Sequence, residues 1–178
     1  EGDDCERFAF FAKAIIETFY ITGFEPDIIH CNDWHTGLVP IYLKERGMYN
    51  IKTIFTIHNL RFQGFFYNDV IEKTLELDRR YFVEDGIKYY DMISFLKGGV
   101  VYSDYITTVS DSYAEEIKTP ELGEGLDGLF RKFDYKLKGI VNGIDGTVFK
   151  LPRKGKKRLK AELQESLGLN QDPDVPLV

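Results

Sequence analysis

The sequence predicts an α/β fold, a partial Rossmann-like parallel sheet flanked by helices. Short runs rich in β-branched and aromatic residues alternate with longer segments of helical periodicity. A helix is expected between the first two strand-like runs, which is the order of a βαβ unit, and such units place parallel strands side by side through right-handed crossovers. The 178 residues, 43% of them hydrophobic, are enough to build the core of one domain.

The first expected element is a helix over residues 6–22. Phe8, Ala12 and Ile15 recur at spacings of three and four, and Gly23 follows the segment as a stop signal. Other apolar residues extend the hydrophobic face nearly all round the helix. We therefore expect this helix to pack between other elements and not to lie on a surface.

The βαβ unit is expected next. Residues 27–30 predict a short buried strand, residues 36–46 a helix that ends at Gly47, and residues 51–58 a second strand. Pro40 is compatible with this helix only near its first turn, because proline lacks the N–H that a helix interior requires. The two strands should run parallel, with their carboxyl ends on one edge of the sheet.

The second half of the chain continues the alternation. Residues 94–102 and 110–118 predict helices, the latter capped by its first serine, with Ser112 and Glu115 at capping-box spacing as a second possibility. Residues 105–109 predict a strand between them. The aromatic, acidic segment 66–90 has weak periodicity and is assigned to no element.

The remaining segments are a loop, a strand and a helix. Residues 123–128 are rich in glycine and predict a flexible surface loop, and residues 138–141 predict the last strand, followed by an Asn-Gly turn. Residues 155–168 begin with basic residues and continue as an amphipathic helix.

Composition excludes several classes of protein. No apolar run reaches the roughly 18 residues that span a bilayer, and no cationic leader precedes one, so the chain is expected to be neither membrane-spanning nor secreted. Its two cysteines, Cys5 and Cys31, argue against a disulfide framework and indicate a cytoplasmic protein. Residues 131–160 hold 11 of the basic and 2 of the acidic residues, which we interpret as a solvated linker, and we expect no binding to nucleic acid.

The candidate site lies in two short stretches, residues 30–35 and residues 56–59. They contain all three histidines and the single tryptophan. Each stretch follows a predicted parallel strand, and in open α/β sheets ligands bind in the crevice beyond the carboxyl ends of the strands. The fold therefore predicts that the two stretches deliver His, Asp and Asn side chains to one place.

Two other interpretations of these residues stay open. Asp33 could simply cap the helix that follows it. The spacing also allows a metal-dependent hydrolase, because imidazole and carboxylate are ligands for zinc or iron. The ligands of that alternative would be His30, Asp33, His35 and His58.

Longer segments resemble a known family. In order and spacing, the strings DIIHCNDWHTGLVPIYLK, FTIHNLRFQGFF, ISFLKGGVVYSDYITTVSDSYAEEI, ELGEGLDGLF and GIVNGIDGTVF are similar to bacterial glycogen synthases and plant starch synthases. DWHTGL and IHNL-x-x-QG are the specific elements. The resemblance implies a GT-B glycosyltransferase that moves glucose from ADP-glucose to the non-reducing end of an α-1,4-glucan, with retention of configuration and without a metal or cofactor.

The resemblance also implies a domain organisation. Residues 1–145 would be part of the N-terminal, Rossmann-like catalytic domain, and residues 146–178 the linker and the start of the C-terminal domain. The family's Lys-x-Gly-Gly-Leu loop and its phosphate-binding Arg and Lys have no counterpart here. We therefore expect the parent protein to be an enzyme and this chain alone to be inactive.

Residue roles follow from the same resemblance. Asp33 and His58 match catalytic positions that line the glucose side of the cleft. The substrate-binding candidates are Trp34, His35, Asn59, Gln63 and Lys97. The expected ligands are ADP-glucose and glycogen, and the competing hypotheses are the metal-dependent hydrolase and a non-catalytic module that binds glucan through exposed aromatic residues.

Overall fold

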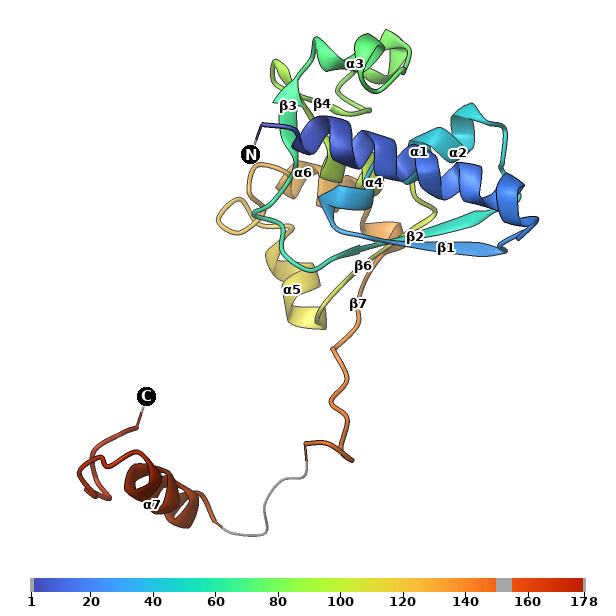
Figure 1. Ribbon diagram of the computed structural model, residues 1–178. Coiled ribbons are helices and arrows are strands. Elements are labelled where there is room, and N and C mark those ends of the chain that lie inside the picture. The colour runs from blue at the N-terminus through green and yellow to red at the C-terminus, as the bar shows by residue number, and fades with distance from the viewer. Residues whose placement is uncertain (1, 150–154, 178) are drawn as a thin grey trace. The chain divides into compact units, whose positions relative to one another are not determined.

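The computed structural model describes residues 2–149 and 155–177. The chain forms two compact units, Glu1–Asn142 and Gly143–Val178. The first unit contains the strands of both β-sheets, and the second contains helix α7, Lys156–Ser166, which confirms the helix predicted within residues 155–168 (Figure 1).

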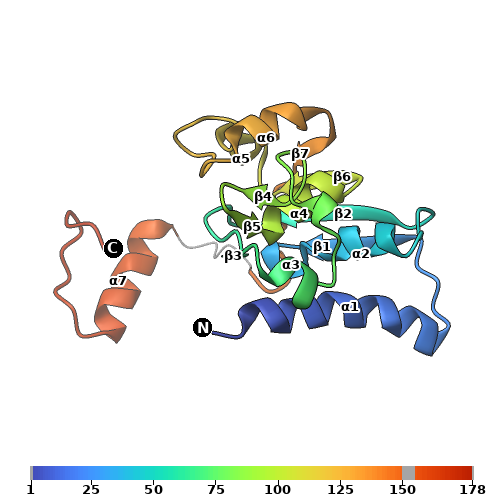
Figure 2. The same cartoon turned by 90° about the horizontal axis from the view of Figure 1, so that it is seen from above.

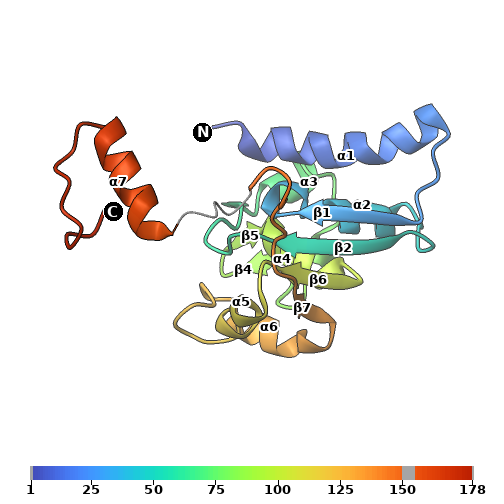
Figure 3. The same cartoon turned by 90° about the horizontal axis from the view of Figure 1, so that it is seen from below.

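A four-stranded parallel sheet organises the first unit. Its strands are β1 (Ile28–Asn32), β2 (Lys52–Ile57), β6 (Tyr105–Thr108) and β7 (Leu137–Gly139), in the order β1-β2-β6-β7. Each neighbouring pair is parallel, and Figure 3 shows β1 and β2 side by side with their arrows in the same direction. The predicted parallel sheet and its βαβ start are therefore confirmed, with β7 beginning one residue earlier than expected.

Helices α2 (Val39–Glu45) and α4 (Phe95–Tyr102) pack on each other and cover one face of this sheet (Figures 1 and 2). Helix α4 lies very close to β2, because a Cβ on Gly99 would be 2.3 Å from the Phe55 ring of that strand. Phe55 is completely buried. The hydrophobic core therefore lies between this helical layer and the strands.

Helix α2 is shorter than the predicted helix 36–46. Residues Trp34–Thr36 form a 3₁₀ turn, and α2 begins only at Val39. Pro40 then falls at the start of the helix, where its missing N–H would have had no intrahelical partner. The proline and the turn before it explain the later start.

Helix α1 (Asp4–Thr22) confirms the first predicted element and ends at Gly23, which adopts the left-handed conformation with φ 66°. It is buried on one side only, and Phe10 and Ile21 on its other side are 74% and 82% exposed. Among the described residues, the prediction that α1 packs on more than one side is therefore wrong. No helix in the described parts of the chain, α1 included, is long and apolar enough to cross a membrane.

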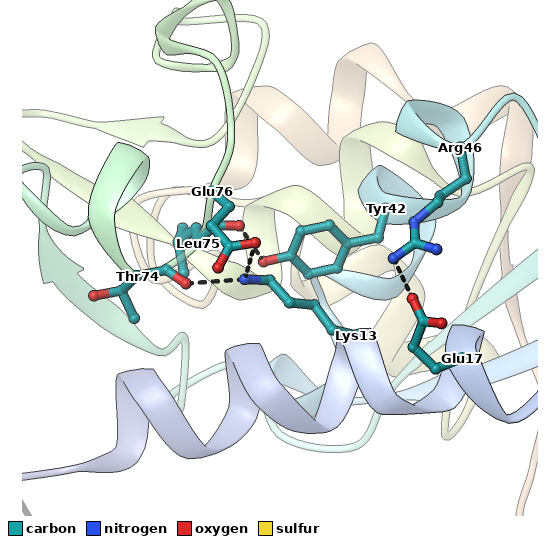
Figure 4. Close-up of polar contacts among 7 residues, drawn as sticks. All are labelled: Lys13, Glu17, Tyr42, Arg46, Thr74, Leu75 and Glu76. Carbon is teal, nitrogen blue, oxygen red and sulfur yellow. Dashed lines mark hydrogen bonds and ion pairs between the residues drawn. The ribbon is translucent and has the colours of Figure 1, made fainter.

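Polar contacts fix α1 and α2 to the segment that follows α3 (Val70–Lys73), as Figure 4 shows. The Tyr42 hydroxyl donates to the Leu75 carbonyl at 2.8 Å, and Lys13 Nζ donates to the Thr74 carbonyl at 3.2 Å. Burial raises the pKa of Tyr42, so the phenol remains a donor. These contacts hold residues 74–76 against the helical layer.

A second, antiparallel sheet lies partly within residues 66–90, the segment that sequence reasoning assigned to no element, and partly just beyond it. Its strands β3 (Phe65–Tyr67), β5 (Met92–Ser94) and β4 (Lys88–Tyr89) pair in the order β3-β5-β4. Strands of two or three residues are too short to show alternation in the sequence.

The last part of the first unit corrects one prediction. Helix α5 (Asp111–Glu116) is capped as expected, because Ser110 Oγ accepts from the Tyr113 N–H at 3.0 Å. Helix α6 (Asp127–Lys132), however, begins inside the predicted loop 123–128. That segment is closely packed, since a Cβ on Gly125 would lie 2.3 Å from the Tyr89 hydroxyl.

Lys136 closes the carboxyl end of α4 from inside the protein. Only 8% of the residue is exposed, and its Nζ donates to the Ser103 carbonyl at 2.6 Å and the Val101 carbonyl at 3.2 Å. Burial, with a smaller contribution from Lys44, lowers the pKa of Lys136 to about 8, although Asp104 acts in the opposite direction. The ammonium is thus partly desolvated at a helix end that favours cations.

The Lys136 contribution to stability is expected to rise with pH. Between the folded pKa of about 8 and the unfolded pKa of roughly 10.4, the unfolded state binds more protons, so the free energy of unfolding increases by roughly 1–3 kcal/mol. Urea unfolding of the wild type and of Lys136→Met, each at pH 7.5 and at pH 10, tests this prediction. The difference between the free energies of unfolding of the two proteins should be larger at pH 10. Cysteines and tyrosines titrate in both proteins, so their effect cancels in this difference. An equal change in the free energy of unfolding of the two proteins between the two pH values would contradict the prediction.

Candidate functional site

The centre of the site is Asp33, directly after β1. Its backbone has φ 54° and ψ −179°, a conformation that is essentially restricted to glycine. Backbone hydrogen bonds hold it there, since its N–H donates to the Thr56 carbonyl at 2.9 Å and its carbonyl accepts from the Thr36 N–H at 3.1 Å. The fold thus keeps an aspartate where the backbone alone would favour glycine.

Asp33 joins the two stretches that the sequence predicted to converge. Its Oδ1 accepts a hydrogen bond from the backbone N–H of His58 at 2.8 Å. The His58 Nε2 lies 3.0 Å from Asn32 Oδ1, an oxygen that can only accept, so Nε2 carries the proton in this pair. The carboxyl ends of β1 and β2 therefore present a carboxylate, an amide and an exposed imidazole together.

His30 lies on the sheet itself, in another environment. Its Nε2 is 2.6 Å from Thr56 Oγ1, which is 2.5 Å from Thr107 Oγ1. This string of hydrogen bonds crosses β1, β2 and β6. His30 is thus engaged with threonines of the neighbouring strands.

Trp34 and His35 belong to an aromatic cluster. Their ring centroids are 4.2 Å apart, and Phe8 of α1 makes an edge contact with both, at 4.8 Å and 4.7 Å. Gly64 packs against the indole so closely that a Cβ there would lie 2.4 Å from Trp34 Cε3. Both side chains are half-buried, and Trp34 packs against the hydrophobic core.

Asn59 and Gln63 shape the loop after β2. Asn59 Oδ1 accepts from the Arg61 N–H at 3.0 Å, which closes a local turn. Gln63 is 4% exposed, and its Nε2 donates to the Glu124 carbonyl at 2.9 Å. In the part of the chain that the structure describes, Gln63 Oε1 is buried without a hydrogen-bond partner.

Lys97 reaches a different loop. Its buried Nζ donates to the Glu84 carbonyl at 2.7 Å and to the Lys88 carbonyl at 2.5 Å. Burial lowers the pKa of Lys97, although the nearby carboxylates of Glu84 and Asp85 oppose the shift. Both bonds tie α4 to residues 84–88. The Asp33 carboxylate has a different partner, the backbone N–H of His58.

The residues of the metal hypothesis do not form a ligand set. Within residues 2–149 and 155–177, no group of three or more His, Cys, Asp or Glu side chains is placed to hold a metal ion. His30 is bonded to Thr56, Asp33 to the His58 backbone, and His35 packs on Trp34. The geometry gives the metal-dependent hydrolase no support.

Sequence reasoning missed the residues that orient this site. Asn32 lies within the first stretch but was given no role, and it contacts the His58 ring. The Thr36 hydroxyl accepts from the Asn32 N–H at 2.7 Å and donates to the Asn32 carbonyl at 2.9 Å. A threonine four residues after an asparagine is too common a pattern to predict these two hydrogen bonds.

Comparisons with known proteins show the family of this chain. Residues 1–132 match the family described as the starch synthase catalytic domain. The chain is 72% identical over 179 residues to glycogen synthase from Fusobacterium nucleatum, covering 100% of the chain and 39% of that protein. It is 48% identical over 189 residues to glycogen synthase from Lachnospira eligens, covering 96% of the chain and 40% of that protein.

One solved structure is also similar. The catalytic domain of starch synthase IV from Arabidopsis thaliana, bound to ADP and acarbose, matches with a TM-score of 0.81 and 31% identity. The match covers 96% of this chain and 38% of that chain. The chain thus spans about two fifths of the length of the relatives it matches, with 39% and 40% for the two glycogen synthases.

Proposed function

The chain belongs to the starch synthase catalytic-domain family, and from this premise we propose that it is part of a longer glycogen or starch synthase. The whole enzyme would transfer glucose from ADP-glucose to the non-reducing end of an α-1,4-glucan, with retention of configuration. The names of the glycogen synthases and the ADP and acarbose bound by the starch synthase IV structure support these substrates. A cytoplasmic location belongs to the same proposal.

The proposal assigns a place to each part of the chain. Residues 1–145 would form part of the N-terminal, Rossmann-like domain, and residues 146–178 the linker and the start of the C-terminal domain. The family match over residues 1–132 and the parallel sheet within the first unit support the first assignment.

The observation that carries the function is the bond between Asp33 Oδ1 and the His58 N–H. Glycosyl transfer passes through an oxocarbenium-like state while a diphosphate leaves. A carboxylate fixed beside the sugar favours that positive charge, because it is already oriented before the reaction. His58 would contact sugar hydroxyls through its exposed ring, and its carbonyl would lie near the developing charge.

The other candidates take positioning roles in this proposal. Asn59 and Gln63 set the loop after β2, and Gln63 links it to residue 124. Trp34 and His35 fix the turn after Asp33 through the aromatic cluster. Lys97 holds the loop at residues 84–88. Lysines, arginines and a helix amino terminus elsewhere in the enzyme would neutralise the diphosphate without a metal.

Glucose incorporation into glycogen tests the proposal. The full-length protein is expected to transfer glucose from ADP-glucose, with UDP-glucose tried in parallel, whereas the isolated 178-residue chain is expected to transfer none. The reason is that the chain supplies the sugar side of the cleft, and the cations for the leaving diphosphate would come from the rest of the enzyme. Absence of transfer by the full-length protein from both donors would refute the synthase assignment. Turnover by the isolated chain would refute the proposal that the cations for the leaving diphosphate come from the rest of the enzyme.

A further inference from the structure

His58 is held at two points by consecutive residues, the last of β1 and the one after it. Asn32 Oδ1 lies 3.0 Å from the ring Nε2, and Asp33 Oδ1 accepts from the backbone N–H at 2.8 Å. The side chains of His58 and Asn32 are both exposed. An exposed imidazole would otherwise rotate about its side-chain torsions, so the contact at Nε2 restricts the orientation that the ring presents to a ligand.

The orientation of the Asn32 amide follows from its other end. Its Nδ2 lies 3.5 Å from the His30 carbonyl oxygen. The reverse orientation would turn the amide oxygen toward this carbonyl, and two acceptors would then face each other. The Asn32 backbone is fixed as well, because the Thr36 hydroxyl bonds both its N–H and its carbonyl, at 2.7 Å and 2.9 Å. Asn32 therefore presents its amide oxygen to the His58 ring.

This contact decides which ring nitrogen of His58 is left for a ligand. A neutral imidazole carries one N–H, and an acceptor beside Nε2 places the proton there. Nδ1 then has a lone pair and can only accept. In the parts of the chain that the structure describes, no protein group is bonded to this nitrogen. The ring is thus prepared to accept a hydrogen bond from a ligand hydroxyl at a fixed place.

We propose that Asn32 is a positioning residue for glucosyl transfer, which fixes His58 as the acceptor, through Nδ1, of a hydrogen bond from one hydroxyl of the donor glucose. The inference rests on the proposed function for the identity of the sugar. An acceptor at Nδ1 sets the direction in which that hydroxyl points its proton. A ring that is oriented before the sugar arrives also loses less entropy on binding. Asn32 acts through His58 and not on the reacting atoms.

Nitrogen NMR spectra of the histidine rings, recorded on isotope-labelled full-length protein, test the assignment directly. The His58 signals, identified by their loss in His58→Gln, are expected to show a protonated Nε2 and an unprotonated Nδ1. Asn32→Leu keeps the size of the side chain and removes the acceptor, so both signals should move toward those of an imidazole that exchanges between its tautomers. Asn68→Leu is the matched control, because Asn68 is also exposed and its Nδ2 donates to the Asp91 carbonyl at 2.7 Å. Its His58 signals should equal those of the wild type.

Donor analogues test the role of Asn32 in transfer. ADP-glucose derivatives that each lack one glucose hydroxyl are compared with ADP-glucose in the full-length protein. One of these deletions is expected to lower kcat/KM in the wild type by roughly 3- to 10-fold more than in Asn32→Leu, because the variant no longer holds the acceptor for that hydroxyl. If Asn32 had a merely structural role, the variant would lose the same factor in kcat/KM with every donor.

Three results would each overturn the inference. They are a protonated Nδ1 in the wild type, unchanged His58 signals in Asn32→Leu, and an equal loss of kcat/KM with every donor. The synthase proposal fails on a separate readout, the absence of glucose transfer by the wild type. The NMR spectra do not depend on transfer, so they show whether Asn32 sets the His58 tautomer in either case.

Discussion

Asp33→Asn in the full-length enzyme is expected to lower kcat by roughly 10²- to 10³-fold with little change in stability. The amide oxygen can still accept from the His58 N–H, so the local geometry persists. The negative charge that would stabilise an oxocarbenium-like state is lost. Asparagine has the same shape as aspartate, so the strained backbone at φ 54° and ψ −179° costs the variant no more than it costs the wild type.

Asp33→Gly separates catalysis from structure at the same position. Glycine adopts φ 54° and ψ −179° without strain, so this variant should melt at the same temperature as the wild type or higher. It removes the carboxylate entirely and should be at least as inactive as Asp33→Asn. Initial rates with ADP-glucose and glycogen, together with thermal unfolding, measure both effects. A glycine variant that keeps wild-type kcat would show that Asp33 only shapes the turn.

The convergence of the two candidate stretches could be predicted from the sequence because it depends on topology. Two strand-like runs separated by a helix must place their carboxyl ends on one edge, and residues 30–35 and 56–59 do meet there. Which atoms meet could not be predicted. The Asp33 carboxylate accepts from the His58 backbone N–H and not from its ring, and no sequence pattern encodes the unusual backbone conformation at Asp33.

Elements that depend on distant partners were the ones that sequence reasoning missed. The strands β3, β4 and β5 have two or three residues each, and only their pairing makes them strands. The apolar residues all round α1 predicted burial on several sides, yet Phe10 and Ile21 are exposed here. Hydrophobicity shows that a face suits burial, but it does not say which segment covers it.

Close packing of backbone on backbone is the other feature that a sequence does not show. Gly37 ends the 3₁₀ turn after Asp33, and a Cβ on it would lie 1.9 Å from the Phe95 carbonyl oxygen at the start of α4. Phe95 is itself anchored, since its N–H donates to the Gly64 carbonyl at 3.1 Å. The turn that carries Asp33 therefore rests directly on α4.

Gly37→Ala is consequently expected to destabilise the protein by about 3 kcal/mol or more. The overlapping atom belongs to the backbone, so relief requires α4 to move, and α4 also carries Gly99 against the Phe55 ring. Gly128→Ala in α6 is the matched control, because its Cβ would meet only the Arg131 side chain at 3.7 Å. Alanine there should stabilise by roughly 0.5–1 kcal/mol as a better helix former. Urea unfolding midpoints compare the two, and a Gly37→Ala midpoint equal to the wild type would mean that the turn and α4 can separate without cost.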